Sequence, residues 1–162
     1  MKVLLLLLVT TCFQPIRETP LNSATNNRGG FYIEYPKGWK YSELGDTRTV
    51  VFGPESDLFR PMIEVDIWEK TMLLKRFIQR KNSKIQANNA FDIFEVDFYE
   101  KLDRKRYQYY YKTIGAGVSM YVSKQFIIHE KKVYIVTQTC ASQEEGLYIS
   151  ILSEINESFE FI

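Results

Sequence analysis

The sequence predicts an α+β fold, in which helices cover a central antiparallel β-sheet. Short segments of alternating apolar and polar residues recur along the chain, and four of them follow one another between residues 91 and 140 with short turns between them. Apolar residues at helical spacing occur in two other segments, residues 72–81 and the C-terminal end. Because these helices stand apart from the runs of strands, the order of elements is typical of the α+β class.

The composition indicates one globular domain behind a short leader. The 162 residues are 45% hydrophobic and 15% aromatic, with 11 Tyr and 11 Phe, which favours a sheet-rich core and excludes a wholly disordered chain. Lys and Arg number 21 against 20 Asp and Glu, so the net charge of +1 gives no general attraction to nucleic acid. We therefore expect no nucleic-acid partner.

Residues 1–12 resemble the signal peptide of a bacterial lipoprotein. Lys2 is followed by an apolar run over residues 3–9, which is too short to span a bilayer. The sequence Val-Thr-Thr-Cys at residues 9–12 resembles a lipobox, although Thr11 departs from the residue types that the motif prefers. The resemblance predicts an acylated Cys12 that anchors the protein to a bacterial membrane on its extracytoplasmic side. A plainly secreted or periplasmic protein is the alternative.

Residues 13–29 have the composition of a flexible linker, rich in Pro, Asn, Ser, Thr and Gly. We expect this linker to connect Cys12 to a domain that covers residues 30–162. Cys140 ends an apolar segment, which favours a buried, inert thiol, while a disulfide between Cys12 and Cys140 is the alternative.

The domain is predicted to open with a strand and an aromatic corner at residues 31–39. Phe31, Ile33 and Tyr35 alternate with polar or more exposed positions, and the corner ends at Trp39. We expect Phe31, Tyr35 and Trp39 to be core and corner residues. If the corner is exposed instead, Tyr35 and Trp39 become a candidate contact surface.

The remaining elements follow in order. A polar turn at residues 42–46 precedes a short strand at 49–52, and the clearest alternation predicts a strand at 62–68. A helix is expected at 72–81. The four consecutive strands are placed at residues 91–99, 106–114, 120–130 and 133–140.

A closing helix is predicted from the segment that follows Cys140. Ser142 and Glu145 have the spacing of a capping box at its start. Four apolar residues recur every four positions and are expected to face the sheet: Leu147, Ile151, Ile155 and Phe159.

Three of these segments together resemble the PsbP-like fold superfamily. They are the opening Phe-Tyr-Ile-Glu-Tyr-Pro-Lys-Gly-Trp at residues 31–39, the strand end Val-Phe-Gly-Pro at 51–54, and Ser-Phe at 158–159 after an amphipathic helix. The resemblance covers roughly residues 30–162. It implies a central antiparallel sheet flanked by helices, an α/β/α sandwich, and a non-catalytic role. The leader fits the bacterial lipoprotein branch of the superfamily, which includes DcrB.

Four acidic residues are the candidate metal site. Glu64 and Asp66 share one face of a predicted strand, and Glu95 and Asp97 share one face of another. If the two strands present a common face, four carboxylates can bind a hard cation such as Ca²⁺. The alternative is the solvated outer face that a one-sided antiparallel sheet requires.

The sequence contains no motif for a phosphate, a nucleotide or a catalytic metal, so we expect no cofactor and no catalytic residues. These observations predict a lipid-anchored, extracytoplasmic binding or assembly module whose partner is an envelope protein or a ligand. The alternatives are an envelope enzyme or metal-binding protein that uses the acidic face. Nothing in the sequence predicts an oligomeric state.

Overall fold

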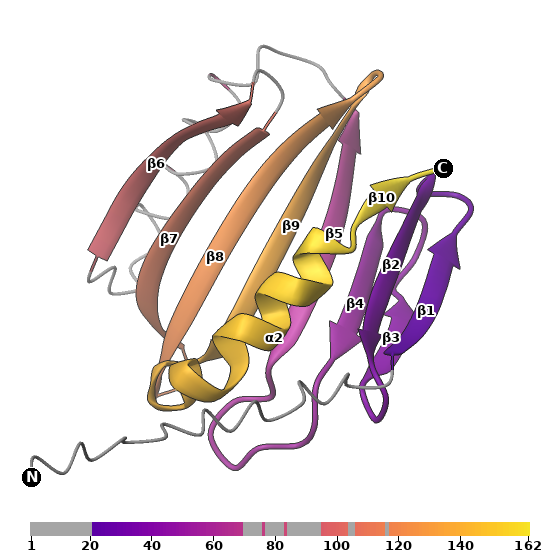
Figure 1. Ribbon diagram of the computed structural model, residues 1–162. Helices are drawn as coiled ribbons and strands as arrows, with labels where there is room; N and C mark the ends of the chain where they lie inside the picture. The colour runs from indigo at the N-terminus through magenta and orange to yellow at the C-terminus, as the bar shows by residue number, and fades with distance from the viewer. Residues whose placement is uncertain (1–20, 70–75, 77–82, 84–94, 104–105, 116) are drawn as a thin grey trace, which may run out of the picture.

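The described residues form two antiparallel sheets and a helix that crosses one face of the larger sheet and also contacts the smaller one (Figure 1). The computed structural model describes residues 21–69, 76, 83, 95–103, 106–115 and 117–162, and the backbone alone between residues 95 and 115. The small sheet has the strand order β1-β2-β10 and the large sheet has the order β3-β4-β5-β9-β8-β7-β6. The small sheet contains β1 (Leu21–Asn26), β2 (Phe31–Pro36) and β10 (Glu160–Phe161).

The large sheet confirms the predicted meander, because four consecutive strands pair with their neighbours in sequence order. These strands are β6 (Glu95–Asp103), β7 (Arg106–Gly115), β8 (Val118–His129) and β9 (Lys132–Ala141). The other three are β3 (Lys40–Glu43), β4 (Arg48–Phe52) and β5 (Met62–Glu69). β5 joins the meander by pairing with β9, which places β6 at the far edge of the sheet.

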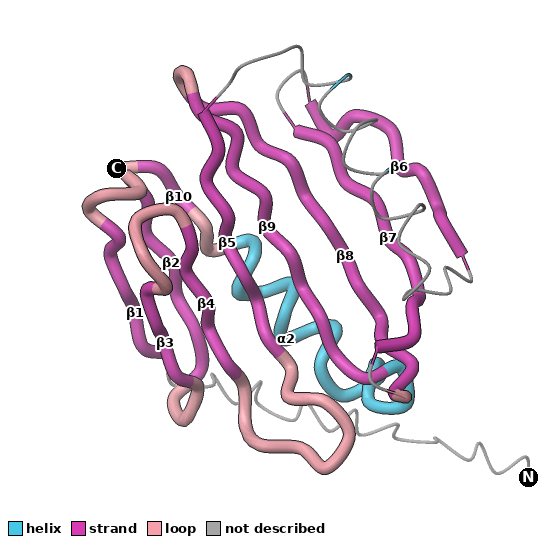
Figure 2. Tube along the Cα trace, turned by 180° about the vertical axis from the view of Figure 1, so that it is seen from behind, coloured by secondary structure: helices cyan, strands magenta, loops and turns pink. Residues whose placement is uncertain are grey.

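The core lies between the large sheet, the small sheet and helix α2 (Glu145–Glu157), which crosses in front of β5 and β9 (Figure 1). Viewed from behind, α2 lies beyond these two strands (Figure 2). Each element contributes one apolar face, since side chains alternate along strands and recur each turn on helices. The core includes Phe31 and Ile33 from β2, Val65 and Ile67 from β5, Tyr134 and Val136 from β9, and Leu152 and Ile155 from α2.

The α+β class is therefore confirmed, with α2 as the helix that covers the core, but the described residues contain fewer flanking helices than the predicted α/β/α sandwich. The predicted helix at residues 72–81 lies outside the described residues, apart from Arg76. The part of the chain that the structure describes contains no helix long and apolar enough to cross a bilayer. The signal peptide, Cys12 and the first part of the predicted linker also lie outside the described residues.

The predicted linker is wrong at its C-terminal end, because β1 occupies residues 21–26. This strand pairs with β2 along its whole length, from Leu21 opposite Pro36 to Asn26 opposite Phe31. The buried Asn26 amide donates to Thr49 Oγ1 (2.8 Å), and its oxygen accepts the Gly29 N–H (2.6 Å). Polar side chains satisfied by such contacts give a strand no apolar alternation, so the composition resembled a linker.

The predicted turn at residues 42–46 is also wrong in part, since β3 runs to Glu43 and forms a hairpin with β4. The turn itself is at Gly45, whose φ of +81° suits glycine. β10 was not predicted either, because its two residues are too few to show a period.

The start of the closing helix differs from the predicted capping box. A 3₁₀ turn, η1 (Ser142–Glu144), precedes α2, and the N-terminal end of α2 has no side-chain capping bond. The Ser142 hydroxyl instead forms a hydrogen bond with the Ser119 hydroxyl (3.0 Å). Ser142 therefore fixes the connection between β9 and α2 to the start of β8.

The buried face of the closing segment is also rotated from the predicted one. Leu147 is 61% exposed, whereas Tyr148, Leu152, Ile155 and Phe159 are buried. Residues spaced strictly by four drift around a helix of 3.6 residues per turn, so the stripe that begins at Leu147 cannot stay on one face. The buried residues are spaced by four, three and four positions, which keeps them on the side of the closing segment that faces the sheet.

Candidate functional site

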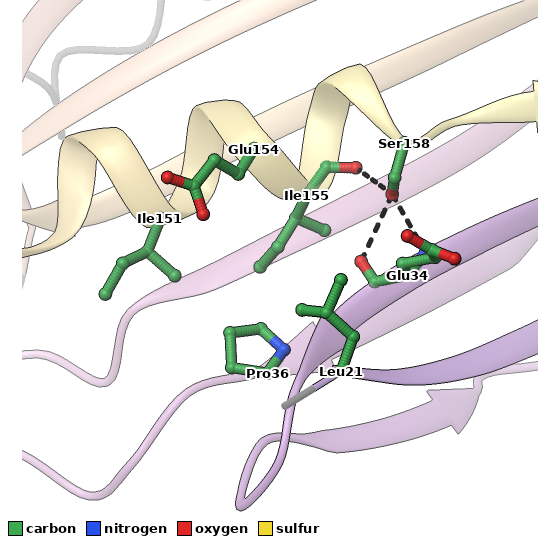
Figure 3. Close-up of a pocket in the computed structure, with 7 residues that line it drawn as sticks. All are labelled: Leu21, Glu34, Pro36, Ile151, Glu154, Ile155 and Ser158. Atoms are coloured by element: carbon green, nitrogen blue, oxygen red, sulfur yellow. Dashed lines mark hydrogen bonds between the residues drawn. The ribbon is translucent and has the colours of Figure 1, made fainter. Parts of the chain in front are cut away.

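A small pocket lies where the C-terminal half of α2 meets the small sheet (Figure 3). Its volume is about 50 Å³. Its apolar wall consists of Leu21, Pro36, Ile151 and Ile155, and its polar wall consists of Glu34, Glu154 and Ser158. Pockets for drug-sized molecules are roughly 300–1,000 Å³, so this one has room for a single side chain rather than a small-molecule ligand.

Strand register and one serine build the pocket. Pairing of β1 with β2 places Leu21 directly opposite Pro36. Just after α2, the Ser158 hydroxyl accepts the Glu34 N–H (2.8 Å) and donates to the Ile155 carbonyl (2.7 Å). The bond to Glu34 fixes the end of the helix to the middle of β2, so the Ser158 side chain holds the two walls together (Figure 3).

Carboxylates give the pocket its charge. Glu34 Oε1 accepts a hydrogen bond from the Tyr32 hydroxyl (2.6 Å), and this bond raises the pKa of Tyr32. Within the described residues, neither Glu34 nor Glu154 has a cationic partner. The last 22 residues of the chain contain five Glu and no Lys, Arg or His, while the rest of the chain has 21 basic and 15 acidic residues. The wall of the pocket that α2 contributes therefore belongs to an acidic segment of a nearly neutral protein.

Exposed apolar side chains continue the pocket along α2. Leu147 lies one helical turn before Ile151 on the same side of the helix, and Leu21 is 51% exposed. We call the set Leu21, Leu147, Ile151, Glu34 and Glu154 the α2 groove. It combines an apolar strip with carboxylates at its border, which is the pattern of a contact surface.

The candidate metal residues are not brought together. Glu64 and Asp66 lie on the face of β5 that points away from α2. Glu95 and Asp97 lie on β6, and β9, β8 and β7 separate the two strands. Four strand spacings amount to about 19 Å, which is too far for four carboxylates to share one ion. Among the described residues, no three acidic, His or Cys side chains converge as metal ligands.

Glu64 and Asp66 instead share one cation. The Arg48 Nε–H donates a hydrogen bond to Asp66 Oδ1 (2.9 Å), and Arg48 Nε also forms an ion pair with Glu64 Oε1 at 3.1 Å. Burial raises the pKa of the Glu64 carboxyl and the nearby Asp66 raises it further, whereas Arg48 and Lys124 lower it in part. The two carboxylates and Arg48, with Lys124 nearby, form a charge cluster on the sheet surface.

This cluster gives a prediction with a defined sign. Asp66→Asn is expected to lower the pKa of Glu64, and Arg48→Gln is expected to raise it, because each substitution removes one of the interactions above. NMR titration of the Glu64 carboxyl measures both shifts. A Glu64 that titrates at its ordinary pKa in the unmodified protein would contradict the prediction.

The same raised pKa makes stability depend on pH. The contribution of Glu64 to stability is fully present below its ordinary pKa and is lost as the pH rises through the higher folded pKa. As the pH rises through that window, the free energy of unfolding of the unmodified protein should therefore fall relative to that of Glu64→Gln, which urea denaturation at several pH values measures.

The aromatic corner is structural rather than exposed. Trp39 is a core residue, so its alternative assignment as a contact residue is wrong. Tyr35 is half-buried and stacks on Tyr41 (6.2 Å between ring centroids). Cys140 is fully buried, and burial raises the pKa of its thiol to about 11, which disfavours the reactive thiolate. His129 stacks on Phe161 (3.9 Å between ring centroids).

Comparison with known proteins gives matches among solved structures only. No family model matches the sequence, and no curated protein matches it. The solution structure of cyanobacterial PsbP (CyanoP) from Synechocystis has a TM-score of 0.63 at 15% identity, covering 92% of this chain and 96% of that one. LpqN of Mycobacterium tuberculosis, described as involved in cell envelope biogenesis, has a TM-score of 0.59 at 11% identity, covering 88% and 86%.

A third similar structure is PA94 of Pseudomonas aeruginosa, described as a putative regulator of unknown function. Its TM-score is 0.55 at 9% identity, with 85% of this chain and 94% of that chain covered. These similarities extend over nearly the whole of each protein, and they show that the chain has the PsbP-like fold.

Proposed function

We propose that this PsbP-like protein is a lipid-anchored, extracytoplasmic binding or assembly module of the cell envelope, with its acyl chain on Cys12 and no catalytic role. One observation carries the proposal. The first strand of the described residues begins at Leu21, only eight residues separate it from Cys12, and Leu21 itself lines the α2 groove. The anchor and the candidate contact surface therefore share one end of the chain.

The length of this connection limits where the groove can act. Nine residue steps from Cys12 to Leu21 span at most about 30 Å when fully extended. An acylated Cys12 thus keeps Leu21, at the edge of the α2 groove, within that distance of the membrane surface. A binding module in this position meets the extracytoplasmic segments of membrane proteins before it meets soluble ones.

Two further observations support the proposal. LpqN, which has the same fold, is described as involved in cell envelope biogenesis. The pocket in the groove is the size of one side chain, which suits contact with another protein better than turnover of a substrate.

Lipidation is tested by mass spectrometry of the mature protein and by membrane fractionation. We expect a mature N-terminus at Cys12 that carries a diacylglyceryl mass, with the protein in the membrane fraction. Cys12→Ser should release the protein from membranes or block processing, whereas Cys140→Ser, at the other cysteine, should leave it anchored. An N-terminus without acylated Cys12 would instead indicate a secreted protein.

The alternative in which the acidic face is the functional site is tested separately, through the charge cluster on the opposite face. Glu64→Gln combined with Asp66→Asn should leave cross-linking to envelope proteins unchanged, because these side chains lie on the face of the sheet that points away from the α2 groove. Loss of the cross-linked product in a folded variant would favour the alternative in which the acidic face is the functional site.

A further inference from the structure

The α2 groove offers a partner two different kinds of contact. Leu147 and Ile151 form an apolar strip along α2, and Leu21 of β1 forms the facing edge. The pocket between them has a volume of about 50 Å³ and a mainly apolar wall, so it accepts one aliphatic side chain. A flat polar surface would lack this anchor point.

Charge at the border of the groove selects the occupant. Glu34 and Glu154 line the pocket from β2 and α2, and within the described residues neither forms an ion pair. α2 and the residues after it carry no basic side chain. A cationic occupant would pair with both carboxylates, whereas an anionic lipid surface would be repelled by them.

We infer that the α2 groove binds a basic segment of a partner protein, in which Lys or Arg residues flank an aliphatic side chain that enters the pocket. This inference rests on the proposed function, because a protein anchored near the membrane needs a partner within reach. The aliphatic side chain fills the space between Leu21 and Ile151, and the flanking cations face Glu34 and Glu154. The inference therefore assigns the kind of partner and the surface that receives it.

The test uses a Lys-rich synthetic peptide with a single central Ile, titrated against the full chain anchored in nanodiscs of neutral lipid. Two comparison peptides carry Glu in place of Lys or Ser in place of Ile. The Lys peptide with Ile should bind best, and its affinity should fall as salt is added. Glu34→Gln combined with Glu154→Gln should weaken it by about tenfold, the effect of losing two partly exposed ion pairs.

The hairpin of β3 and β4 supplies matched controls. Leu44 is 49% exposed, close to the 51% of Leu21. Glu43 accepts a hydrogen bond from a tyrosine two residues before it, as Glu34 does. Leu21→Ser should weaken the Lys peptide severalfold, while Leu44→Ser and Glu43→Gln should leave its affinity unchanged. The inference would be overturned if the control variants weakened binding as much as the groove variants did. It would also be overturned if the peptide with Ser bound as tightly as the peptide with Ile, or if no peptide bound.

Photo-crosslinking in the native envelope separates failure of this inference from failure of the proposed function. A photoreactive residue at position 21 should capture a basic segment of another envelope protein, and one at position 44 should not. The groove assignment would be overturned if only position 44 captured a partner, or if position 21 captured a second copy of this chain. Either result would still support a binding role for the protein. Capture from neither position, together with an unacylated Cys12, would remove the proposed function as well.

Discussion

Trp39→Ala is expected to lower the free energy of unfolding by about 3 kcal/mol or more. Trp39 is 8% exposed, and its ring packs edge-on against Tyr148 of α2, with 6.4 Å between ring centroids. The ring also lies so close to Gly53 that a β-carbon there would be 3.1 Å from Trp39 Cη2. Alanine would leave a cavity between α2 and the loop after β4, and the surrounding backbone can fill it only in part.

The second tryptophan is the matched control. Trp68 lies at the exposed end of β5 and is 43% exposed, so Trp68→Ala should cost less than half as much as Trp39→Ala. Urea denaturation followed by far-UV circular dichroism measures both, since that signal comes mainly from the backbone. Equal losses in the two variants would show that Trp39 does not anchor the core.

The strands that sequence patterns predicted well are those with one apolar face. β5 alternates cleanly because Ile63, Val65 and Ile67 face α2 while Glu64 and Asp66 face away. The consecutive strands of the meander were predictable because short turns force neighbouring strands to pair. Sequence patterns did not predict β1, β3 and β10, because these strands are polar or very short. Their positions are set by the strands with which they pair, β2 for β1 and β10, and β4 for β3.

The order of strands in the sheet explains why the four candidate metal ligands do not come together. Alternation identifies which face Glu64 and Glu95 occupy in their own strands, but it carries no information about which strands become neighbours. β5 pairs with β9, the last strand of the meander, instead of with β6, the first. Tertiary packing determines this pairing, which leaves β9, β8 and β7 between the two acidic pairs.

The α2 groove was hidden for a related reason, since its residues come from three distant parts of the chain. Leu21, Glu34 and Ile151 meet only because β1 pairs with β2 and Ser158 fixes α2 to β2. One signal was nevertheless present in the sequence. The absence of basic residues from the last 22 positions, in a chain of net charge +1, by itself indicates an acidic surface at the C-terminal end.

Phe31→Ala is expected to lower the free energy of unfolding by about 3–5 kcal/mol, because Phe31 joins both sheets to the end of α2. Its ring is fully buried, stacks on Phe159 with 5.0 Å between centroids, and meets Tyr134 edge-on. The Tyr134 hydroxyl donates to the Gly29 carbonyl (2.7 Å), and that backbone lies against the Phe31 ring. Removing the ring therefore loosens the turn between β1 and β2 as well as the core.

Two variants make this prediction specific. Phe31→Leu keeps most of the apolar volume and should cost clearly less than alanine, since the stacking on Phe159 is lost but the cavity is smaller. Phe52→Ala removes a ring that is only partly buried and lies under the Arg60 guanidinium, so its cost should be less than half that of Phe31→Ala. Urea denaturation of the three variants gives the order directly. If Phe52→Ala proved as costly as Phe31→Ala, the aromatic contacts of Phe31 would not be what joins β2 to the large sheet.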